Sequence, residues 1–68
     1  MNMIPVSSTN LSAVGYDGEI LRIQFRSGGL YEYYGVPSFA YTGLMNAASK
    51  GRYFVSFIKN KYPCIKIL

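Results

Sequence analysis

The chain of 68 residues contains no histidine, no tryptophan and a single cysteine, Cys64. One thiol without histidine cannot supply the ligand set of a protein zinc site, and it cannot close a disulfide within the chain. We therefore expect no bound metal and no cofactor. A free thiol without a disulfide framework fits a reducing compartment, so we expect the protein in the cytoplasm.

Acidic side chains are also scarce, with three carboxylates against seven lysines and arginines. Asp17, Glu19 and Glu32 are too scattered for a convincing acid–base pair, and Ser7 and Ser8 have no histidine to activate them. The sequence therefore predicts a binding protein and not an enzyme. The formal net charge of +4 favours a phosphate-bearing partner, although a charge of this size also serves solubility alone.

Long apolar runs are missing as well. No segment approaches the roughly 20 apolar residues that a membrane-spanning helix requires, and residues 1–6 do not resemble a signal peptide. We expect no membrane partner. Half of the residues are hydrophobic, which is typical of one small folded domain over residues 1–68. So short a chain cannot enclose a deep pocket, so a ligand should bind in a surface groove or between subunits.

What the chain does contain is seven tyrosines among its seven lysines and arginines. Aromatic rings with hydroxyl groups, interleaved with cations, suit flat and negatively charged ligands. This composition predicts a surface that binds such a ligand, without identifying it.

Three strands are expected in the first half of the chain. Residues 9–14 are mildly apolar and lead to Asp17-Gly18, a pair that indicates a type I′ hairpin turn. Residues 20–26 alternate between apolar and polar side chains, which indicates a half-buried strand with a basic outer side. Residues 30–36 form the third strand, which carries Tyr31, Tyr33 and Tyr34.

The turn at residues 27–29 decides which side chains of the third strand face the core. A plain two-residue turn would place Glu32 beside Phe25 on the covered face. A bulged turn containing glycine shifts the register by one residue and places Tyr31 and Tyr33 there instead. We favour the bulged turn, because burying Glu32 without a partner is the costlier outcome.

A first helix is expected after the strands. Ala40, Leu44 and Ala48 recur at four-residue steps, which predicts a helix from about residue 38 to 48. Gly43 weakens this helix by about 1 kcal/mol.

A second amphipathic helix follows from residue 53 and ends before Pro63. The apolar tail, residues 63–68, is expected to add a strand, to pack on the core or to form an interface. The predicted fold is therefore α+β: a three-stranded antiparallel meander covered on one face by two helices, in the order β-β-β-α-α, with the other face open.

The order of several short motifs resembles the KTSC domain family. The motifs lie between residues 8 and 62 and are Val14-Gly15-Tyr16-Asp17, Leu21-Arg22-Ile23-Gln24-Phe25, Gly28, Tyr31-Glu32-Tyr33, Val36-Pro37, Leu44, Ala48-Ser49-Lys50-Gly51 and Tyr53-Phe54. That family takes its name from the C-terminus of some lysyl-tRNA synthetases and also occurs as free-standing bacterial and phage proteins. The resemblance implies a compact α+β domain with a central Tyr-x-Tyr, no established activity and a suggested role in RNA binding. Residues 63–68 extend past the usual end of that family.

Tyr31 and Tyr33 are two residues apart and so share one strand face. They predict either a platform on which bases stack, worth about 1–3 kcal/mol per base, or rings that fill the space between sheet and helices. We favour the second interpretation, because so short a chain has little other core.

Arg22, Arg26 and Tyr34 are expected on the opposite sheet face. They predict either a strip that binds a nucleotide through stacking and phosphate contacts, or a solvated face on which an arginine pairs with Glu32. This open face is also the expected place for self-association into a homo-oligomer.

Ser49, Lys50, Gly51 and Arg52 begin the second helix. Free N–H groups, a glycine and two cations predict an anion site. The structural alternative is a tight turn in which Ser49 caps the helix and Gly51 relieves crowding, and the two uses can coexist.

These residues together predict a non-catalytic module that binds phosphate-bearing nucleotide ligands as RNA or other single strands. One alternative is a phage-type protein that sequesters a nucleotide signal of host immunity in pockets between subunits. A second alternative is a protein–protein adaptor that uses Tyr34 and the tail.

Overall fold

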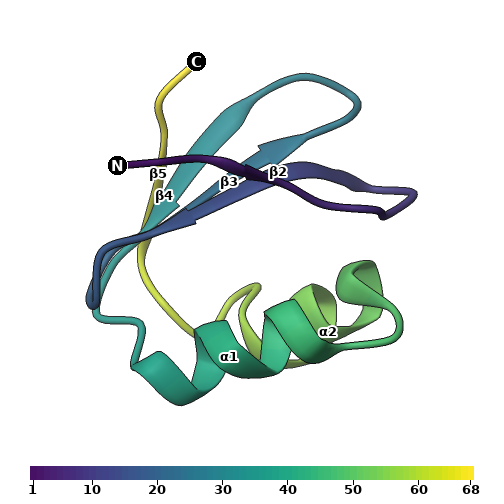
Figure 1. The fold of residues 1–68 in the computed structure, drawn as a ribbon. Helices are drawn as coiled ribbons and strands as arrows, with labels where there is room; N and C mark the ends of the chain where they lie inside the picture. The colour runs from purple at the N-terminus through teal and green to yellow at the C-terminus, as the bar shows by residue number, and fades with distance from the viewer.

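Five antiparallel strands form one sheet, and two helices cover one of its faces (Figure 1). The computed structural model describes all 68 residues. The strands pair in their order along the chain, and the last one follows the helices. The elements are β1 (Ile4–Pro5), β2 (Leu11–Tyr16), β3 (Leu21–Phe25), β4 (Leu30–Tyr33), α1 (Ser38–Asn46), α2 (Lys50–Phe57) and β5 (Cys64–Lys66).

The predicted α+β class, the three central strands and the two covering helices are confirmed, but the strand count is wrong. β1 pairs with β2, and β5 from the tail pairs with β4, so the three-stranded meander is extended at both edges. Segments of two and three residues are too short to display an alternating pattern in the sequence. They are strands because the outer strands of the meander offer them free backbone groups.

The β3–β4 turn has the predicted bulge. The N–H of Phe25 donates to the carbonyl of Gly29 at 3.1 Å, and Gly28 adopts a φ of 103°. In the resulting register Ile23 lies opposite Tyr31, and Arg22 lies opposite Glu32. The tyrosines of β4 therefore face the helices, and Glu32 faces the uncovered side.

The β2–β3 turn differs from the prediction. Its Asp17 carboxylate accepts the N–H groups of Glu19 and Ile20 at 3.0 and 2.7 Å, and these hydrogen bonds lower the pKa of Asp17. Only Gly18 has a positive φ here, whereas a type I′ turn needs positive φ at both central residues. The hairpin forms as expected, but with the Asp17 side chain closing a wider loop.

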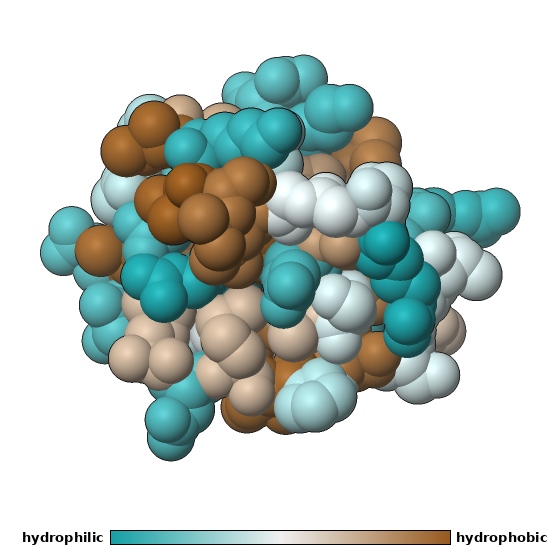
Figure 2. All heavy atoms as spheres, turned by 90° about the horizontal axis from the view of Figure 1, so that it is seen from above, coloured by the Kyte–Doolittle hydropathy of each residue, from teal (hydrophilic) through white to brown (hydrophobic).

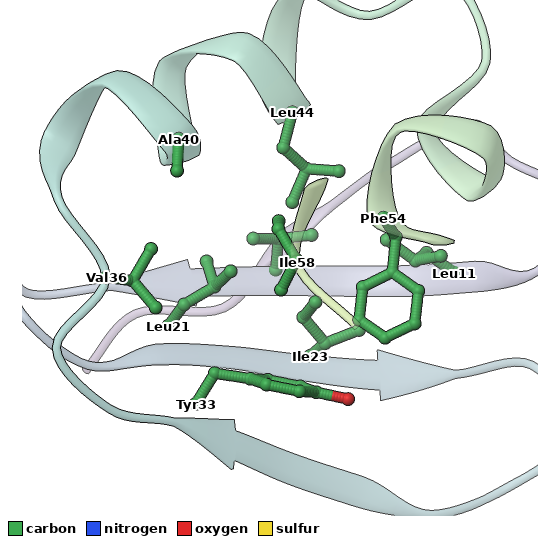
Figure 3. Close-up of a cluster of buried hydrophobic side chains, with 10 residues drawn as sticks. Leu11, Leu21, Ile23, Tyr33, Val36, Ala40, Leu44, Phe54 and Ile58 are labelled. Carbon is green, nitrogen blue, oxygen red and sulfur yellow. The ribbon is translucent and has the colours of Figure 1, made fainter. Parts of the chain in front are cut away.

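A bulge in β2 allows two of its residues to enter the core. Leu11 and Val14 are three positions apart, and a regular strand would place them on opposite faces. The pairing with β3 shifts between Leu11 and Ala13, so both Leu11 and Val14 are fully buried. Figure 3 shows side chains of the core between the helices and the sheet. The core contains Leu11, Val14, Leu21, Ile23, Tyr33, Val36, Ala40, Leu44, Phe54 and Ile58.

Both helices are shorter than predicted. α1 ends at Asn46, before the predicted end near residue 48. α2 begins at Lys50, earlier than the amphipathic pattern from residue 53 predicted, and the hydroxyl of Ser49 caps it by accepting the N–H of Arg52 at 3.3 Å. α2 ends at Phe57 because the chain reverses at Asn60, a left-handed residue with φ 64°. Neither helix has the length and apolar character needed to cross a membrane.

Candidate binding groove

Three hollows lie in a row along the β3–β4 hairpin and α2, from the residues just before α2 to the turn that follows it. We call them together the edge groove, and its parts the cationic end, the middle and the aromatic end. The cationic end, about 410 Å³, is lined by Ser7, Ser8, Thr9, Arg26, Ala48, Ser49 and Lys50. The middle, about 250 Å³, is lined by Thr9, Asn10, Phe25, Arg26, Ser27, Phe54 and Val55. The aromatic end, about 390 Å³, is lined by Phe25, Ser27, Gly28, Tyr31, Tyr33, Phe54, Lys59, Asn60 and Cys64.

The three hollows are neighbours along one side of the molecule, because each shares lining residues with the next. Thr9 and Arg26 belong to both the cationic end and the middle. Phe25, Ser27 and Phe54 belong to both the middle and the aromatic end. A single extended ligand can therefore contact both ends of the edge groove.

Arg26 fixes the shape of the cationic end. Its Nε donates to the carbonyl of Ser8 at 2.5 Å, and its Nη2 donates to the carbonyl of Val6 at 3.4 Å. The Ser8 hydroxyl accepts the N–H groups of Asn10 and Leu11, both at 3.2 Å. These bonds hold the segment before β2 against the β3–β4 turn, with its hydroxyl groups lining the hollow.

The electrostatics of the cationic end favour an anion. Arg26 and Lys50 supply two positive charges, and no carboxylate is among the lining residues. Lys50 donates to the carbonyl of Ala47 at 3.3 Å, which places its ammonium group beside the end of α1. α2 begins here without an acidic residue in its first turn, so its positive dipole end adds to the same potential.

Packed rings form the aromatic end. Phe54 meets Phe25 edge-on at a centroid distance of 5.3 Å and Tyr33 at 5.5 Å, and Phe25 meets Tyr31 at 5.6 Å. Tyr33 is only 5% exposed, and burial raises the pKa of its phenol to about 12. Tyr31 remains half-buried, so it is the tyrosine that a ligand can reach, while Tyr33 forms the floor.

The predicted basic strip on the open sheet face is divided in the structure. Arg22 pairs with Glu32, with Nε donating to Oε2 at 2.9 Å, and the Tyr34 hydroxyl donates to Oε1 at 2.8 Å. The hydrogen bond from Arg22, and to a smaller extent the one from Tyr34, lowers the pKa of the Glu32 carboxyl group. Arg26 follows the last residue of β3 and turns away into the edge groove, so Arg22 and Arg26 do not act together.

Of the four residues predicted to form an anion site at the start of α2, only two line the edge groove. Ser49 and Lys50 line the cationic end, but Gly51 is buried against Asn10, and a Cβ at Gly51 would lie 2.6 Å from the Asn10 amide nitrogen. Arg52 is exposed and does not line the edge groove. The expected role of Gly51 in relieving crowding fits this contact, whereas no phosphate can approach its Cα.

Of the nine predicted site residues, five line the edge groove: Arg26, Tyr31, Tyr33, Ser49 and Lys50. The sequence did not lead us to the polar run Ser7-Ser8-Thr9-Asn10, which lines the cationic end and the middle, or to Lys59 at the aromatic end. Four consecutive polar side chains with three hydroxyl groups are a signal that the sequence does offer. That this polar run lies next to Ser49 and Lys50 follows only from the tertiary fold.

Comparisons with other proteins agree with this fold. The sequence profile of the KTSC domain matches residues 7–62. A crystal structure of a KTSC domain protein from Yersinia pestis is 46% identical, covers 98% of this chain and 97% of its own, and superposes with a TM-score of 0.95. An uncharacterized protein of Stutzerimonas stutzeri is 38% identical over 64 residues, which are 91% of this chain and 90% of that protein.

A lysine–tRNA ligase of Nostoc punctiforme is 48% identical over 44 residues, which are 65% of this chain and 8% of the ligase. The match to the ligase is therefore confined to one small segment of a much longer protein. The matches to the KTSC profile and to the Yersinia structure, in contrast, cover most of this chain. The chain belongs to the KTSC domain family.

Proposed function

We propose that this protein is a non-catalytic module that binds phosphate-bearing nucleotide ligands, as RNA or other single strands, in the edge groove. The observation that carries the proposal is that a cationic, hydroxyl-lined hollow and an aromatic one adjoin the same middle hollow and share lining residues with it. Single-stranded nucleic acid presents these same two features, anionic phosphates and flat bases, in alternation along its length.

The cationic end suits a phosphate group. Arg26 and Lys50 offer positive charge, and Ser7, Thr9 and Ser49 add hydroxyl groups around them. Charged groups that neutralise phosphates release counterions, and this makes the affinity depend on salt. No carboxylate lines this hollow to repel an anion.

The aromatic end suits a base. Tyr31 is half-exposed, and its ring is held by an edge contact with Phe25. A ring that is already fixed loses little conformational freedom when a base stacks on it, and such stacking is worth about 1–3 kcal/mol per base. Lys59 and Asn60 lie beside the rings and are available to the backbone of the same strand.

The relatives are consistent with an RNA ligand. The related segment of the Nostoc protein belongs to a lysine–tRNA ligase, a protein whose substrate by name is an RNA. The matched segment is 8% of that ligase, so the proposal takes from it a nucleic-acid context and not the ligase reaction. The unpaired Cys64 fits a place for this module in a reducing compartment such as the cytoplasm.

The proposal is tested by titrating short single-stranded RNA and DNA at several salt concentrations, with fluorescence anisotropy as the readout. We expect Lys50→Gln to weaken binding several-fold and to reduce the slope of log K against log salt by about 0.7, the contribution of one phosphate contact on a single strand. Lys61→Gln removes the same charge outside the edge groove and is the matched control, with an expected change near zero.

Strand length provides a second readout in the same titration. We expect affinity to rise from a mononucleotide to a short strand, because only the strand occupies both ends of the edge groove. A mononucleotide or cyclic nucleotide that binds as tightly as the strand would support sequestration of a nucleotide signal instead. Equal loss of binding in Lys50→Gln and Lys61→Gln would remove the edge groove as the site, and cleavage of the RNA would contradict a non-catalytic role.

A further inference from the structure

On the uncovered face of the sheet, apolar side chains near the two edge strands, which we call the apolar border, flank a closed polar centre. At the centre Glu32 accepts hydrogen bonds from Arg22 on one oxygen and from Tyr34 on the other. Ile65 on β5 lies directly opposite Glu32 in the strand register and is 55% exposed. Figure 2 shows the molecule from above the sheet, where brown apolar atoms gather beside teal polar ones.

The N-terminal methionines extend this apolar border to the other edge of the sheet. A Cβ at Gly15 would lie 2.7 Å from the sulfur of Met3 and 3.0 Å from the sulfur of Met1, so both side chains cover β2 on this face. Met1 remains 46% exposed. Methionine adapts its shape readily and is frequent at protein–protein contacts.

The strand side chains of this face carry no net charge, in a molecule with a net charge of +4. Arg22 is the one cation that the strand register places on this face, and Glu32 compensates its charge. Lys66 of β5 pairs with Tyr31 and so points to the side of the helices. Two copies of a basic protein repel each other least through a surface of this kind.

We propose that this face binds a second copy of the same chain as a weak symmetric homodimer. A two-fold axis brings the apolar border of one copy against that of the other. The Arg22–Glu32 pairs of the two copies then run antiparallel to each other across the interface. Because Glu32 is already satisfied within its own chain, covering it leaves no carboxylate without a partner.

The size of the face limits the strength of the dimer. The molecule measures about 25 Å across, so its whole cross-section is on the order of 600 Å², which limits a flat contact to less than the roughly 800 Å² per partner of a standard stable interface. We therefore expect a dimer that dissociates in the micromolar range or above. The edge groove lies between the sheet and the helices and stays accessible in such a dimer.

Sedimentation velocity of the full chain from micromolar to millimolar concentration tests the proposal. The wild type should convert from monomer to dimer within this range, and Ile65→Glu should remain a folded monomer, with a lower Tm because its carboxylate lies directly opposite Glu32. Phe39→Glu is the matched control, because Phe39 is an equally apolar side chain on α1, 74% exposed, and should leave the dimer intact. If the wild type stays monomeric at all concentrations, the face serves a different partner and the proposal is overturned. A dimer that is lost in Phe39→Glu and kept in Ile65→Glu overturns it as well.

A measurement on the unmodified chain keeps the test independent of how Ile65→Glu folds. Amide chemical shifts of the wild type should change on dilution at Gly15, Arg22 and Ile65, and stay constant along α1 and α2. Concentration-dependent shifts confined to the helices would place the contact there and overturn the proposal.

Discussion

Gly43 lies in the middle of α1, where a glycine weakens a helix by about 1 kcal/mol relative to alanine. The structure supplies the reason for its presence. A Cβ at this position would lie within 3 Å of three atoms of the Tyr53 ring and hydroxyl group. Tyr53 also packs against Phe57 at a centroid distance of 4.7 Å, so displacing its ring would disturb this contact. The missing side chain allows α1 and α2 to approach closely.

Gly43→Ala should therefore destabilise the protein, although alanine has a higher helix propensity than glycine. We expect a loss of about 1–3 kcal/mol in the free energy of unfolding, which is typical of overpacking, measured by urea denaturation. In a Tyr53→Ala background the same change should raise stability by up to about 1 kcal/mol, because only the helix propensity remains. A gain of stability from Gly43→Ala in the wild-type background would contradict this account.

The β3–β4 hairpin is the element that organises both surfaces of the protein. Its bulged turn places Tyr31 and Tyr33 toward the helices, where they form the aromatic end of the edge groove. The same register places Arg22 opposite Glu32 on the other face. A shift of the β3–β4 pairing by one residue would turn Tyr31 and Tyr33 to the open face and Glu32 toward the helices. The groove and the open sheet face therefore both depend on this one turn.

The Arg22–Glu32 pair should make the hairpin sensitive to acid. Arg22 and Tyr34 lower the pKa of Glu32 below its ordinary value of 4.5, so the pair stabilises the fold above that pH. This contribution is lost as the pH falls through the lowered pKa. We expect Glu32→Gln to have a lower Tm than the wild type at neutral pH, and the difference to shrink below pH 4.5.

Glu19→Gln is the control for this experiment, because Glu19 is an exposed carboxylate that forms no ion pair. Its Tm at neutral pH should match that of the wild type. If the difference in Tm between Glu32→Gln and the wild type stays constant down to strongly acidic pH, the Arg22–Glu32 pair is not the origin of that difference.

On the scale of the whole molecule, charge is separated along β3. Asp17 and Glu19 lie in the turn before β3, whereas Arg26 follows its other end and lies in the edge groove with Lys50. A strand of five residues spans about 17 Å, which exceeds the roughly 8 Å over which exposed charges interact at physiological salt. Local charge should therefore decide ligand affinity, and not the net charge.

Glu19→Gln tests this point in the oligonucleotide titration. It raises the net charge from +4 to +5, yet we expect the affinity at physiological salt to change less than twofold. Lys50→Gln, with the opposite change in net charge, should weaken binding several-fold. An affinity that follows the net charge in both variants would indicate non-specific attraction in place of a defined site.

The sequence by itself determined the α+β class, the three central strands, the two helices and the orientation of Tyr31 and Tyr33. Each of these depends on information carried by neighbouring residues, such as alternation in 20–26, glycine in the β3–β4 turn and four-residue spacing in α1. Local periodicity and turn chemistry are visible in the chain because they act over a few residues.

The tertiary structure decided the edges of the sheet, where it selected the added strand among the outcomes expected for the tail, and the composition of the groove. β1 and β5 have no pattern of their own and exist through pairing, as between Tyr31 and Lys66, which are far apart in the chain. The end of β3 at Phe25 separates Arg22 from Arg26, and the loop before β2 meets the turn before α2 only when the sheet and helices pack. Such contacts arise from backbone pairing and burial across the whole molecule, which no local pattern records.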